Sequence, residues 1–437
     1  MPRLSLIERL RITSLAAERA RRRLVSRALY SRLLRWRYGS AVSDQLLILP
    51  QDLRTRDPSF WDEIEVGQFG LAGSLAMVDG GSPFETRPPS DAWARTLHGF
   101  DWLRHLEAAE SPEARDEARR LAVEWTGRYR GGGGGVPWLP EVIARRMISW
   151  ISHAGLLLED ADPKTYDAIT ESLGIQLVRL SATWRTAPVG PPRLQSLMAI
   201  VLGDLTIADH DRQLAEAERL LADELVRQIL PDGGHISRNP AVLVELMLDL
   251  LPLSQCFIAR DRKVPPEISS AIQRAFGMLR FMRMGDGSLA RFNGAGIADP
   301  AHIATVLAYD PGSNPEHMDR APHCGYFRND AGESILICDA GPPPPLEYAG
   351  TAHAGCLSFE LSYGSQLIFV NGGAPRPRET EWINKSRATV SHNTLCLGEK
   401  SSSKMVRHPF LEDLVGAHPI RYPNNVTAKV LVADDAW

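Results

Sequence analysis

Polar residues that can bind a carboxylate or a metal ion lie near the ends of short predicted strands in the C-terminal third of the sequence. His353 stands just before an alternating stretch from Leu357 to Tyr363, Asn371 follows the next apolar run, and His392 precedes a third. Alternation with a period of two residues is typical of a strand with one buried face. If these strands are neighbours in a sheet, we expect the three side chains to converge at one end of it.

The two histidines allow two chemical interpretations. As neutral imidazoles, His353 and His392 can coordinate a metal ion. Alternatively, His353 together with Arg387 can orient and neutralise an acidic substrate. A single histidine is usually structural, but two of them beside Asn371 and Asn393 favour a functional site, in which Asn393 is a candidate substrate contact.

A second polar cluster lies in residues 231–240, between two predicted helices. Two adjacent glycines permit a tight turn there, and His235, Arg238 and Asn239 supply a titratable group, a fixed cation and an amide. Loops at one end of a helical ring line a cleft, so these side chains are candidates for substrate contact. The alternative interpretation is that Asn239 caps a helix and His235 is an ordinary loop histidine.

A third candidate is an aromatic and basic segment. Trp138 and Trp150 lie at helical distance with Arg145 between them, which predicts a stacking face and a carboxylate clamp for a sugar. Equally, the tryptophans can be core and the arginine exposed. The glycine run Gly131–Gly135 lacks the Lys-Ser/Thr ending and the preceding strand of a phosphate-binding loop.

These residues need two kinds of scaffold. Helical periodicity dominates from about residue 91 to residue 284, with Pro at or near several helix starts. The predicted helices are Ser90–Glu110, Pro112–Thr126, Pro140–Leu158, Pro163–Thr186, Leu194–His210, His210–Ile229, Ala241–Ile258 and Pro265–Met284. Helix pairs of similar length predict an α/α arrangement, such as an incomplete toroid.

After Gly285 the pattern changes to short β segments. The predicted strands are Gly325–Phe327, Ser334–Asp339, Cys356–Ser362, Gln366–Val370, Asn393–Leu397 and Val426–Ala433. We therefore expect an α+β multidomain chain, in which an α/α toroid or incomplete barrel precedes an antiparallel β-sandwich that is truncated at the C-terminus. The expected divisions are a basic N-terminal helix or arm (1–45), a toroid (46–300) and a partial β-sandwich (301–437).

Composition and the absence of certain motifs disfavour several classes of protein. Lys+Arg 49 against Asp+Glu 53 gives a net charge of −4, so nothing in the overall charge favours nucleic-acid binding. The 5 cysteines are widely spaced and form no CxxC pair, so neither a disulfide framework nor a cysteine zinc site is indicated. Gly-x-Ser-x-Gly, HExxH and dinucleotide-binding patterns do not occur, which disfavours serine hydrolysis and hydride transfer.

The N-terminal segment is rich in arginine and carries only Glu8 and Glu18 as acids between Arg3 and Arg37. Apolar residues fall between the arginines at helical spacing, so the segment is either a solvated basic helix or a helix that makes peripheral contact with a membrane or partner. It lacks the apolar core of a secretory signal. No apolar run approaches the length of a transmembrane helix.

Taken together, the helical region and the motifs PDGGHISRNP, GDGSLARFNG, AHAGCLSFELS and RATVSHNTL resemble the heparinase II/III-like family, from about Asp91 onward. The resemblance implies a toroid, a β-sandwich and a polysaccharide cleft between them. It also implies β-elimination: a polar group neutralises a uronate carboxylate, a base removes the C5 proton and an acid protonates the leaving oxygen. Preorganised donors are needed because negative charge develops on the carboxylate as the proton leaves.

The resemblance assigns roles to individual residues. His235 or Asn239 would neutralise the carboxylate, with His353 and Arg387 near the scissile bond. His353 and His392 would stand at the family's metal ligands, with Asn371 where an aspartate is usual. An amide weakens such a site, so no cofactor is expected to be required, and a structural zinc in the β domain is the open alternative.

The family's motif His-Ala-His-Ala-Asp reads differently here, because Thr351 replaces the first histidine and Gly355 the acid. The expected catalytic tyrosine is also missing: the aromatic residues near GDGSLARFNG are Phe281 and Phe292. The remaining candidates for the proton donor in this half are Tyr309, Tyr326, Tyr348 and Tyr363. Tyr348 is preferred because it immediately precedes the His353 loop.

The sequence thus predicts a lyase acting on an acidic polysaccharide or oligosaccharide. The alternative is a non-catalytic carbohydrate-binding or envelope-assembly protein on the same scaffold. The resemblance implies the cell envelope or periplasm, whereas the absence of an export signal favours the cytoplasm.

Overall fold

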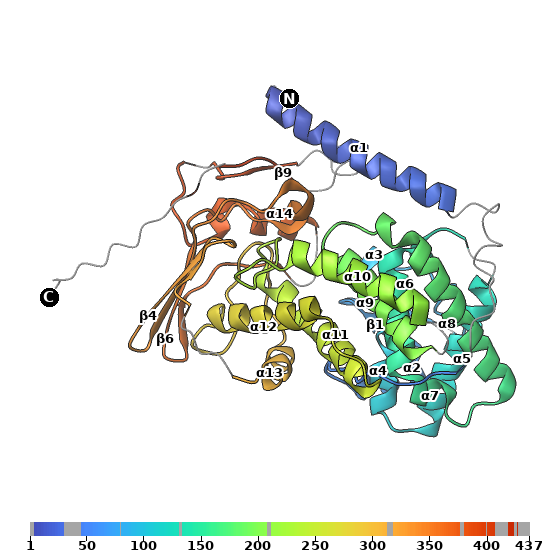
Figure 1. Cartoon of the computed structure of the whole chain (residues 1–437). Helices are drawn as coiled ribbons and strands as arrows, with labels where there is room; N and C mark the ends of the chain where they lie inside the picture. The colour runs from blue at the N-terminus through green and yellow to red at the C-terminus, as the bar shows by residue number, and fades with distance from the viewer. Residues whose placement is uncertain are drawn as a thin grey trace.

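The computed structural model describes residues 4–29, 45–78, 80–130, 133–207, 211–312, 318–375, 380–398, 400–406, 418–423 and 426. A helical domain is followed by a smaller β domain, and a long N-terminal helix lies across both (Figure 1). The fold therefore has the order that the sequence predicts, a toroid without closure followed by an antiparallel β domain.

The helical domain is built from helices that pack around one core, against both consecutive and non-consecutive helices. Its elements are α2 (Ser59–Glu65), β1 (Gln68–Leu71), β2 (Ser74–Met77), α3 (Asp91–Gly99), α4 (Leu103–Ala108), α5 (Pro112–Tyr129), η2 (Val136–Trp138), α6 (Pro140–Ser152), α7 (Ala154–Leu158), α8 (Pro163–Thr183), η3 (Trp184–Thr186), α9 (Pro191–Thr206), α10 (Asp211–Gln228), α11 (Pro240–Ala259), α12 (Pro266–Phe281) and α13 (Pro300–Ala308). Contacts are densest for the pairs α6–α9, α9–α10 and α11–α12.

Capping chemistry explains where several helices begin. Ser111, Asp162 and Asn239 each accept a hydrogen bond from a backbone N–H of the following helix. In each case a proline follows at the first helical position, where its missing N–H costs nothing. The sequence located these starts to within a few residues for the same reason.

Two helix predictions are wrong, because each covers two helices. Residues 140–158 form α6 and α7, which are separated at His153. Residues 90–110 form two helices, because Phe100 adopts a left-handed conformation with φ 57° after α3. The Phe100 side chain is fully buried and packs against Trp102 and Trp150. Burial of this ring compensates the cost of the left-handed backbone.

The β domain contains a five-stranded antiparallel sheet in the order β3-β4-β5-β6-β7 within the described residues. Its strands are β3 (Arg320–Ala321), β4 (Tyr326–Ala331), β5 (Ser334–Asp339), β6 (Phe359–Tyr363) and β7 (Gln366–Phe369). The remaining elements are η4 (Leu346–Thr351), α14 (Thr380–Ser386), η5 (Thr389–Ser391) and the two-stranded ribbon β8 (Lys404–Met405) and β9 (Pro419–Arg421).

Two strand predictions do not match these elements. Asn393–Leu397 contains no strand, and only an isolated bridge joins Leu397 to Lys400. Polar contacts hold this segment instead: the Asn393 amide donates to the Phe359 carbonyl and Thr394 to the Cys356 carbonyl. All but the first residue of Val426–Ala433 lies outside the described residues.

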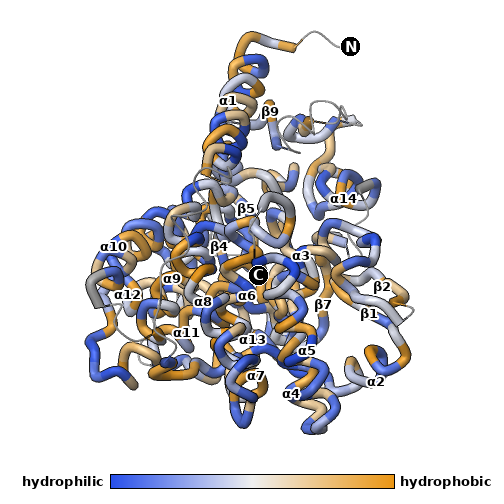
Figure 2. Tube along the Cα trace, turned by 90° about the vertical axis from the view of Figure 1, so that its right-hand side faces the viewer, coloured by the Kyte–Doolittle hydropathy of each residue, from blue (hydrophilic) through white to orange (hydrophobic). Residues whose placement is uncertain are grey.

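A single apolar cluster extends from the toroid into the β sheet and includes Leu53, Trp125, Leu279 and Ile337. Hydrophobic segments run through the interior helices in Figure 2. Of the described helices, only α11 is long and apolar enough to cross a membrane, and 67% of its apolar window is buried inside the protein. The hydrophobic character of α11 is therefore explained by its place in the core.

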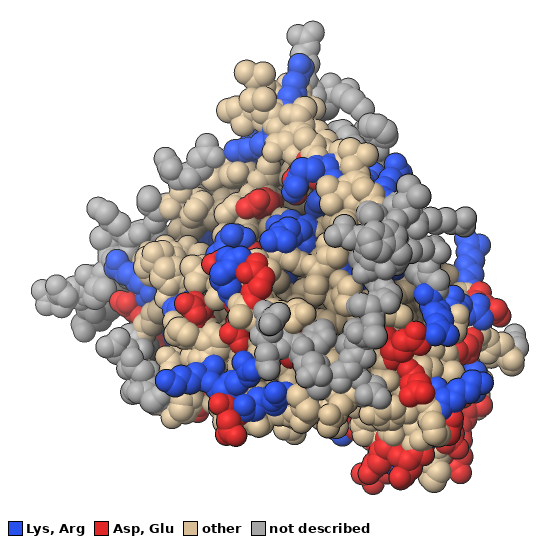
Figure 3. All heavy atoms as spheres, turned by 45° about the vertical axis from the view of Figure 1, so that its right-hand side comes forward, with Lys and Arg blue, Asp and Glu red and all other residues tan. Residues whose placement is uncertain are grey.

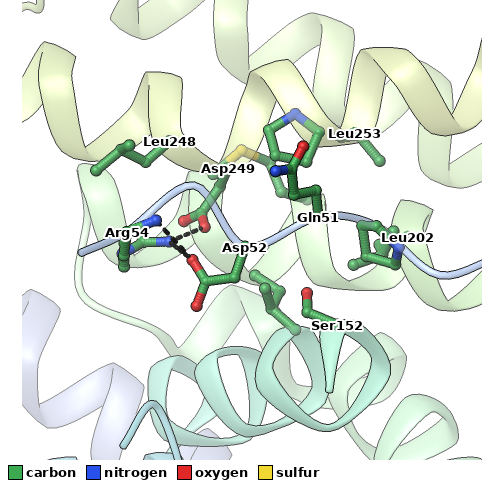
Figure 4. Close-up of a pocket in the computed structure, with 12 residues that line it drawn as sticks. Gln51, Asp52, Arg54, Ser152, Leu202, Leu248, Asp249 and Leu253 are labelled. Carbon is green, nitrogen blue, oxygen red and sulfur yellow. Dashed lines mark hydrogen bonds and ion pairs between the residues drawn. The ribbon is translucent and has the colours of Figure 1, made fainter. Parts of the chain in front are cut away.

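A buried ion-pair network ties the segment before α2 to the toroid. Arg54 donates to Asp249 at 2.8 Å (Figure 4). Arg145 donates to the other oxygen of the same carboxylate at 2.7 Å. Asp52 lies 3.8 Å from Arg54. The adjoining cavity has a volume of about 20 Å³, enough for a water molecule but not for a sugar. This network therefore has a structural role.

Helix α1 (Leu6–Leu29) is held at its N-terminal half by the ribbon of β8 and β9. Glu8 lies 3.3 Å from Lys404 and 3.7 Å from Arg421, and Arg11 donates to the Ile420 carbonyl at 2.9 Å. Ile12 packs with Ile420 in a small apolar cluster. The C-terminal half of α1 extends toward α8 and η3 of the helical domain (Figure 1).

Candidate functional site

A cleft between the two domains contains the best candidate site. One cavity, of about 790 Å³, is lined by Asn239 from the toroid, by Tyr348, His353 and Arg387 from the β domain, and by one face of α1. A second cavity of about 750 Å³ shares Asn239 and several neighbouring residues with it, so the two form one continuous groove. This volume suits a sugar chain.

The hydrogen bonds of His392 determine which nitrogen of His353 carries the proton. His392 Nδ1 lies 2.8 Å from the Ala388 carbonyl, which can only accept, so Nδ1 must carry a hydrogen. In neutral His392 the other nitrogen, Nε2, is then an acceptor, and His353 Nδ1 donates to it at 3.1 Å. His353 Nε2 is therefore unprotonated. Of the two rings, only His353 lines the cavity, where this lone pair is a potential base.

Burial favours the neutral form of both imidazoles, and nearby positive charge adds to this effect at His353. Burial, with contributions from His392 and Arg387, lowers the pKa of His353 to about 3. Burial also lowers the pKa of His392. Arg387 is fixed in the same wall because its Nε donates to the Ala352 carbonyl at 2.9 Å. The positive charge near His353 is thus permanent.

Asn239 presents an amide donor to the cleft. Its Oδ1 accepts from the Ala241 N–H at 3.0 Å as the cap of α11, which fixes the orientation of the side chain. Within the part of the chain that the structure describes, Nδ2 has no hydrogen-bond partner. The prediction of a cap and the prediction of a substrate contact are compatible, because the two functions use different atoms of one amide.

Tyr348 of η4, which carries a phenolic hydroxyl, lines the same cavity. No hydrogen bond to this hydroxyl occurs among the described residues. Burial, with Glu224 and Glu347 nearby, raises the pKa of Tyr348 to about 12, so the phenol keeps its proton. In contrast, Tyr326 is buried and its hydroxyl donates to the Arg238 carbonyl and accepts from Asn293 at 3.0 Å.

His235 does not reach the cleft, so its predicted catalytic role is wrong. The side chain is 1% exposed, and its Nε2 donates to Gln228 Oε1 at 2.8 Å while Nδ1 accepts from the Ser237 N–H at 3.1 Å. The Gln228 amide nitrogen donates to the Gly190 carbonyl, which fixes the direction of the first bond. Burial lowers the pKa of His235 to about 3. This histidine is a structural link between α10 and the loop 231–240.

Arg238 is also structural, so its predicted substrate contact is wrong. Its guanidinium is buried, forms an ion pair with Asp339, and donates to the Cys324 carbonyl and, at 2.6 Å, to the Pro342 carbonyl. Asp232 accepts from the Cys324 N–H at 2.7 Å. The loop 231–240 therefore clamps the β domain to the toroid and leaves Asn239 at the edge of the cleft.

Close packing explains the two glycines of this loop. A Cβ at Gly233 would lie 1.9 Å from the Arg274 carbonyl oxygen, and a Cβ at Gly234 would lie 1.9 Å from the Cys324 sulfur. Gly233 also has a φ of 88°. Any side chain here would push α12 or the β domain away.

The predicted aromatic platform lies in the core. Trp150 is 0% and Trp138 3% exposed, and both pack against Trp125. The prediction that they stack on a sugar is therefore wrong, because other side chains already cover their faces. Arg145 does line the 750 Å³ cavity, but its guanidinium is held by both oxygens of Asp249.

Asn371 and Asn393 lie behind the cleft, so the predicted substrate contact of Asn393 is wrong. Asn371 is 1% exposed, and its Oδ1 accepts from the Asn393 N–H at 2.9 Å. The Asn393 amide donates to the Phe359 carbonyl. Neither residue lines the cavities described above.

The residues at the expected zinc position do not fit that ion well. His353 and His392 are hydrogen-bonded to each other, and the third position offers the oxygen of Asn371, which already accepts from the backbone. The described residues include no group of three or more His, Cys, Asp or Glu that could hold a metal ion. A Cβ at Gly355 would lie 2.9 Å from His392 Cδ2, so the acid of the family's motif has no room here.

The sequence interpretation missed the contribution of α1 to the cleft. Six residues of the helix line the 790 Å³ cavity: Leu15, Glu18, Arg19, Arg22, Arg23 and Ser26. Their spacing of three and one residues describes a single helical face. This helical face can be recognised in the sequence, but nothing in the sequence indicates which surface of the protein it covers.

The fold and cleft define the class: an α/α toroid joined to an antiparallel β domain, with a groove between them. Residues 313–434 match the family model described as "Heparinase II/III-like, C-terminal". The structure entitled "Crystal Structure of Heparinase III" aligns with a TM-score of 0.59 at 14% identity, covering 76% of this chain and 60% of that chain. A heparan sulfate lyase HepC mutant from Pedobacter heparinus aligns with a TM-score of 0.54 at 16% identity, covering 92% and 69%. Identities this low show the shared fold alone.

Residues 313–434 are heparinase II/III-like, as the motifs predict, and the chain shares the fold of the heparinase III structures. A curated relative, FtsZ-localized protein C of Caulobacter vibrioides (strain NA1000 / CB15N), is 34% identical over 328 residues. The match covers 74% of this chain and 56% of that protein, so the chain spans little more than half the length of this relative.

Proposed function

We propose that the chain cleaves an acidic, uronate-containing polysaccharide by β-elimination in the interdomain cleft. The proposal is supported by one observation above all: an amide donor, a protonated phenol and an unprotonated imidazole nitrogen line the same cavity. They belong to Asn239, Tyr348 and His353. These are the three kinds of group that the reaction needs.

Each group has a defined role. The Asn239 Nδ2 amide donates to the uronate carboxylate and stabilises the negative charge that builds up there. His353 Nε2 accepts the C5 proton, and Tyr348 donates its proton to the glycosidic oxygen as that bond breaks. The product is an unsaturated uronate and a free hydroxyl, so protons and electrons balance.

The charge around His353 suits an anionic substrate. Before substrate binds, the low pKa of His353 keeps Nε2 unprotonated near neutral pH. The same low pKa makes the imidazole a weak base. A bound carboxylate stabilises the imidazolium and thus raises the pKa of His353 when the base is needed. Arg387 adds positive potential that attracts the same carboxylate.

The direct test is the ultraviolet absorbance of the unsaturated product. The chain is incubated with alginate, heparan-type polysaccharides and bacterial exopolysaccharides. Tyr348→Phe should reduce turnover by several orders of magnitude, whereas Tyr326→Phe should keep it, because the Tyr326 hydroxyl is buried away from the cleft. Equal activity of both variants, or no product from any polymer, would contradict the proposal.

A second candidate is a non-catalytic carbohydrate-binding or envelope-assembly role on the same scaffold. It is favoured by the name of the 34% identical relative, which records a location with FtsZ rather than a reaction. It predicts glycan binding that survives His353→Ala without formation of product. Glycan binding and formation of the unsaturated product, measured on the same samples, distinguish the two functions.

A further inference from the structure

Helix α1 covers the cleft, and its covering face is basic. The basic residues that line the 790 Å³ cavity are Arg19, Arg22, Arg23, Arg95 and Arg387. The acidic ones are Glu18, Glu141 and Glu347. Glu18 is already paired with Arg21 at 3.0 Å, and Glu141 with Arg95 at 2.6 Å. The cavity therefore carries an excess of positive charge, much of it supplied by α1.

Arg22 lies in the cleft without adequate compensation. Its Nε is buried and has no hydrogen-bond partner among the described residues. The one acidic partner described, Glu18, lies 3.9 Å away and bonds Arg21 instead. Burial lowers the pKa of Arg22. Arg193 and Arg19 add to this shift, and Glu18 and Glu141 oppose it only in part. A buried cationic donor of this kind is stabilised when an anion binds.

The other end of the groove has the opposite character. Its acidic lining residues are Asp101, Glu141, Glu245, Asp249 and Asp299. Its arginines are Arg95, Arg104 and Arg145, and Arg145 is occupied by Asp249. On the face shown in Figure 3, Lys and Arg lie in the upper middle, at the lower left and on the right, and acidic side chains are most concentrated at the lower right. Anionic substituents therefore have one preferred end.

We propose that α1 forms the second wall of the polysaccharide site, in which Arg22 and Arg23 pair with an acidic group of a sugar unit next to the one that reacts. This inference rests on the proposed function, because it assigns the substrate's neighbouring acidic group to the same cleft. The ligand class is an oligosaccharide with acidic groups on successive units, carboxylate or sulfate. Since the N-terminal half of α1 is fixed to β8 and β9, the covering half is held in place over Tyr348 and His353.

The test compares two double variants that remove equal charge from one helix. Arg22→Gln/Arg23→Gln changes the cavity face, and Arg9→Gln/Arg27→Gln changes exposed residues outside the cavity. Binding of alginate-derived and heparin-derived hexasaccharides is measured by calorimetry near 0.01 M ionic strength, where the Debye length is about 30 Å. We expect the cavity variant to weaken binding on the order of 10-fold, and the control about twofold or less.

Each result decides between the alternatives. Equal weakening by both variants would overturn the proposal, since it would reflect net charge alone. The exposed apolar residues Leu6, Ile7 and Leu10 make a lipid surface the competing partner, so anionic phosphatidylglycerol vesicles are tested in parallel. Loss of vesicle binding with unchanged oligosaccharide binding in the cavity variant would also overturn it.

Failure of the proposed function gives a different result. Wild-type binding that depends on Arg22 and Arg23 without product formation supports the role of α1 and refutes catalysis. A wild-type chain that binds neither hexasaccharide and forms no product from any of the polymers refutes both.

Discussion

The buried pair of Arg238 and Asp339 offers the sharpest quantitative test of the interdomain clamp. Arg238→Met keeps the apolar stem but removes the guanidinium and its bonds to the Cys324, Gly341 and Pro342 carbonyls. Asp339 stays buried with one side-chain donor, Asn293 Nδ2 at 3.1 Å, and the Gly341 N–H at 3.3 Å.

Breaking one side of a buried pair costs about 3–5 kcal/mol. That is a large part of the total stability of about 5–15 kcal/mol that proteins have. For a domain of about 150–250 residues it corresponds to a decrease in Tm of roughly 6–20 °C. We expect this loss in thermal and urea unfolding followed by tryptophan fluorescence.

Two further variants decide whether the pair is the cause. Arg120→Met removes an arginine from exposed pairs with Glu117 and Glu124, so it should change stability by less than about 1 kcal/mol. Arg238→Met/Asp339→Asn should be more stable than the sum of its single changes, because no unpaired charge remains. A loss below about 1 kcal/mol for Arg238→Met, or strict additivity, would refute the clamp.

Three other outcomes follow from the site. Asn239→Ala should lower the free energy of unfolding by about 0.5–2 kcal/mol, because the cap of α11 is lost, and should also abolish turnover. Asn239→Asp should keep the cap but not turnover. Unfolding and product assays on both variants test this. His235→Gln should lower the unfolding midpoint but leave kcat per folded molecule near wild type; a kcat loss of several orders of magnitude would return His235 to the reaction. Burial holds the pKa of His235 and of His353 at about 3, below the roughly 6.5 of an unfolded chain, so the unfolded state binds more protons between these values. The contribution of these histidines to the free energy of unfolding is therefore full above about pH 6.5 and decreases toward about pH 3, by up to about 1.4 kcal/mol per pH unit for each histidine. When urea midpoints are plotted against pH, His235→Gln should show a shallower slope than wild type.

Local chemistry made most helices predictable. Prolines and caps such as Asp162 and Asn239 give helix starts that depend on a few adjacent residues. The break between α3 and α4 at Phe100 was missed because Trp125 and Trp150, which pack against its ring and stabilise the left-handed backbone, are distant in the sequence. Similarly, Asn393–Leu397 has the alternation of a strand, but no neighbouring strand pairs along its length among the described residues.

The candidate site was predictable in part. Asn239, His353 and Tyr348 line one cavity. Asn239 and His353 belong to the motifs, whereas Tyr348 lies outside them and was chosen because it precedes the His353 loop. The sequence could not separate them from His235 and Arg238, because exposure is decided by packing between domains. His235 has the right type and the right neighbours, yet Gln228 and Ser237 occupy both of its nitrogens.

Gly355 restricts how this cleft can change over evolutionary time. Gaining a carboxylate at this position requires space that His392 occupies, since the two would approach to 2.9 Å. Shortening residue 392 to make that space would delete the imidazole that a zinc ion would use and that orients His353. No single substitution therefore leads back to the histidine-and-acid arrangement. Descendants of this chain can diversify the polymer they recognise far more easily than they can acquire that metal centre.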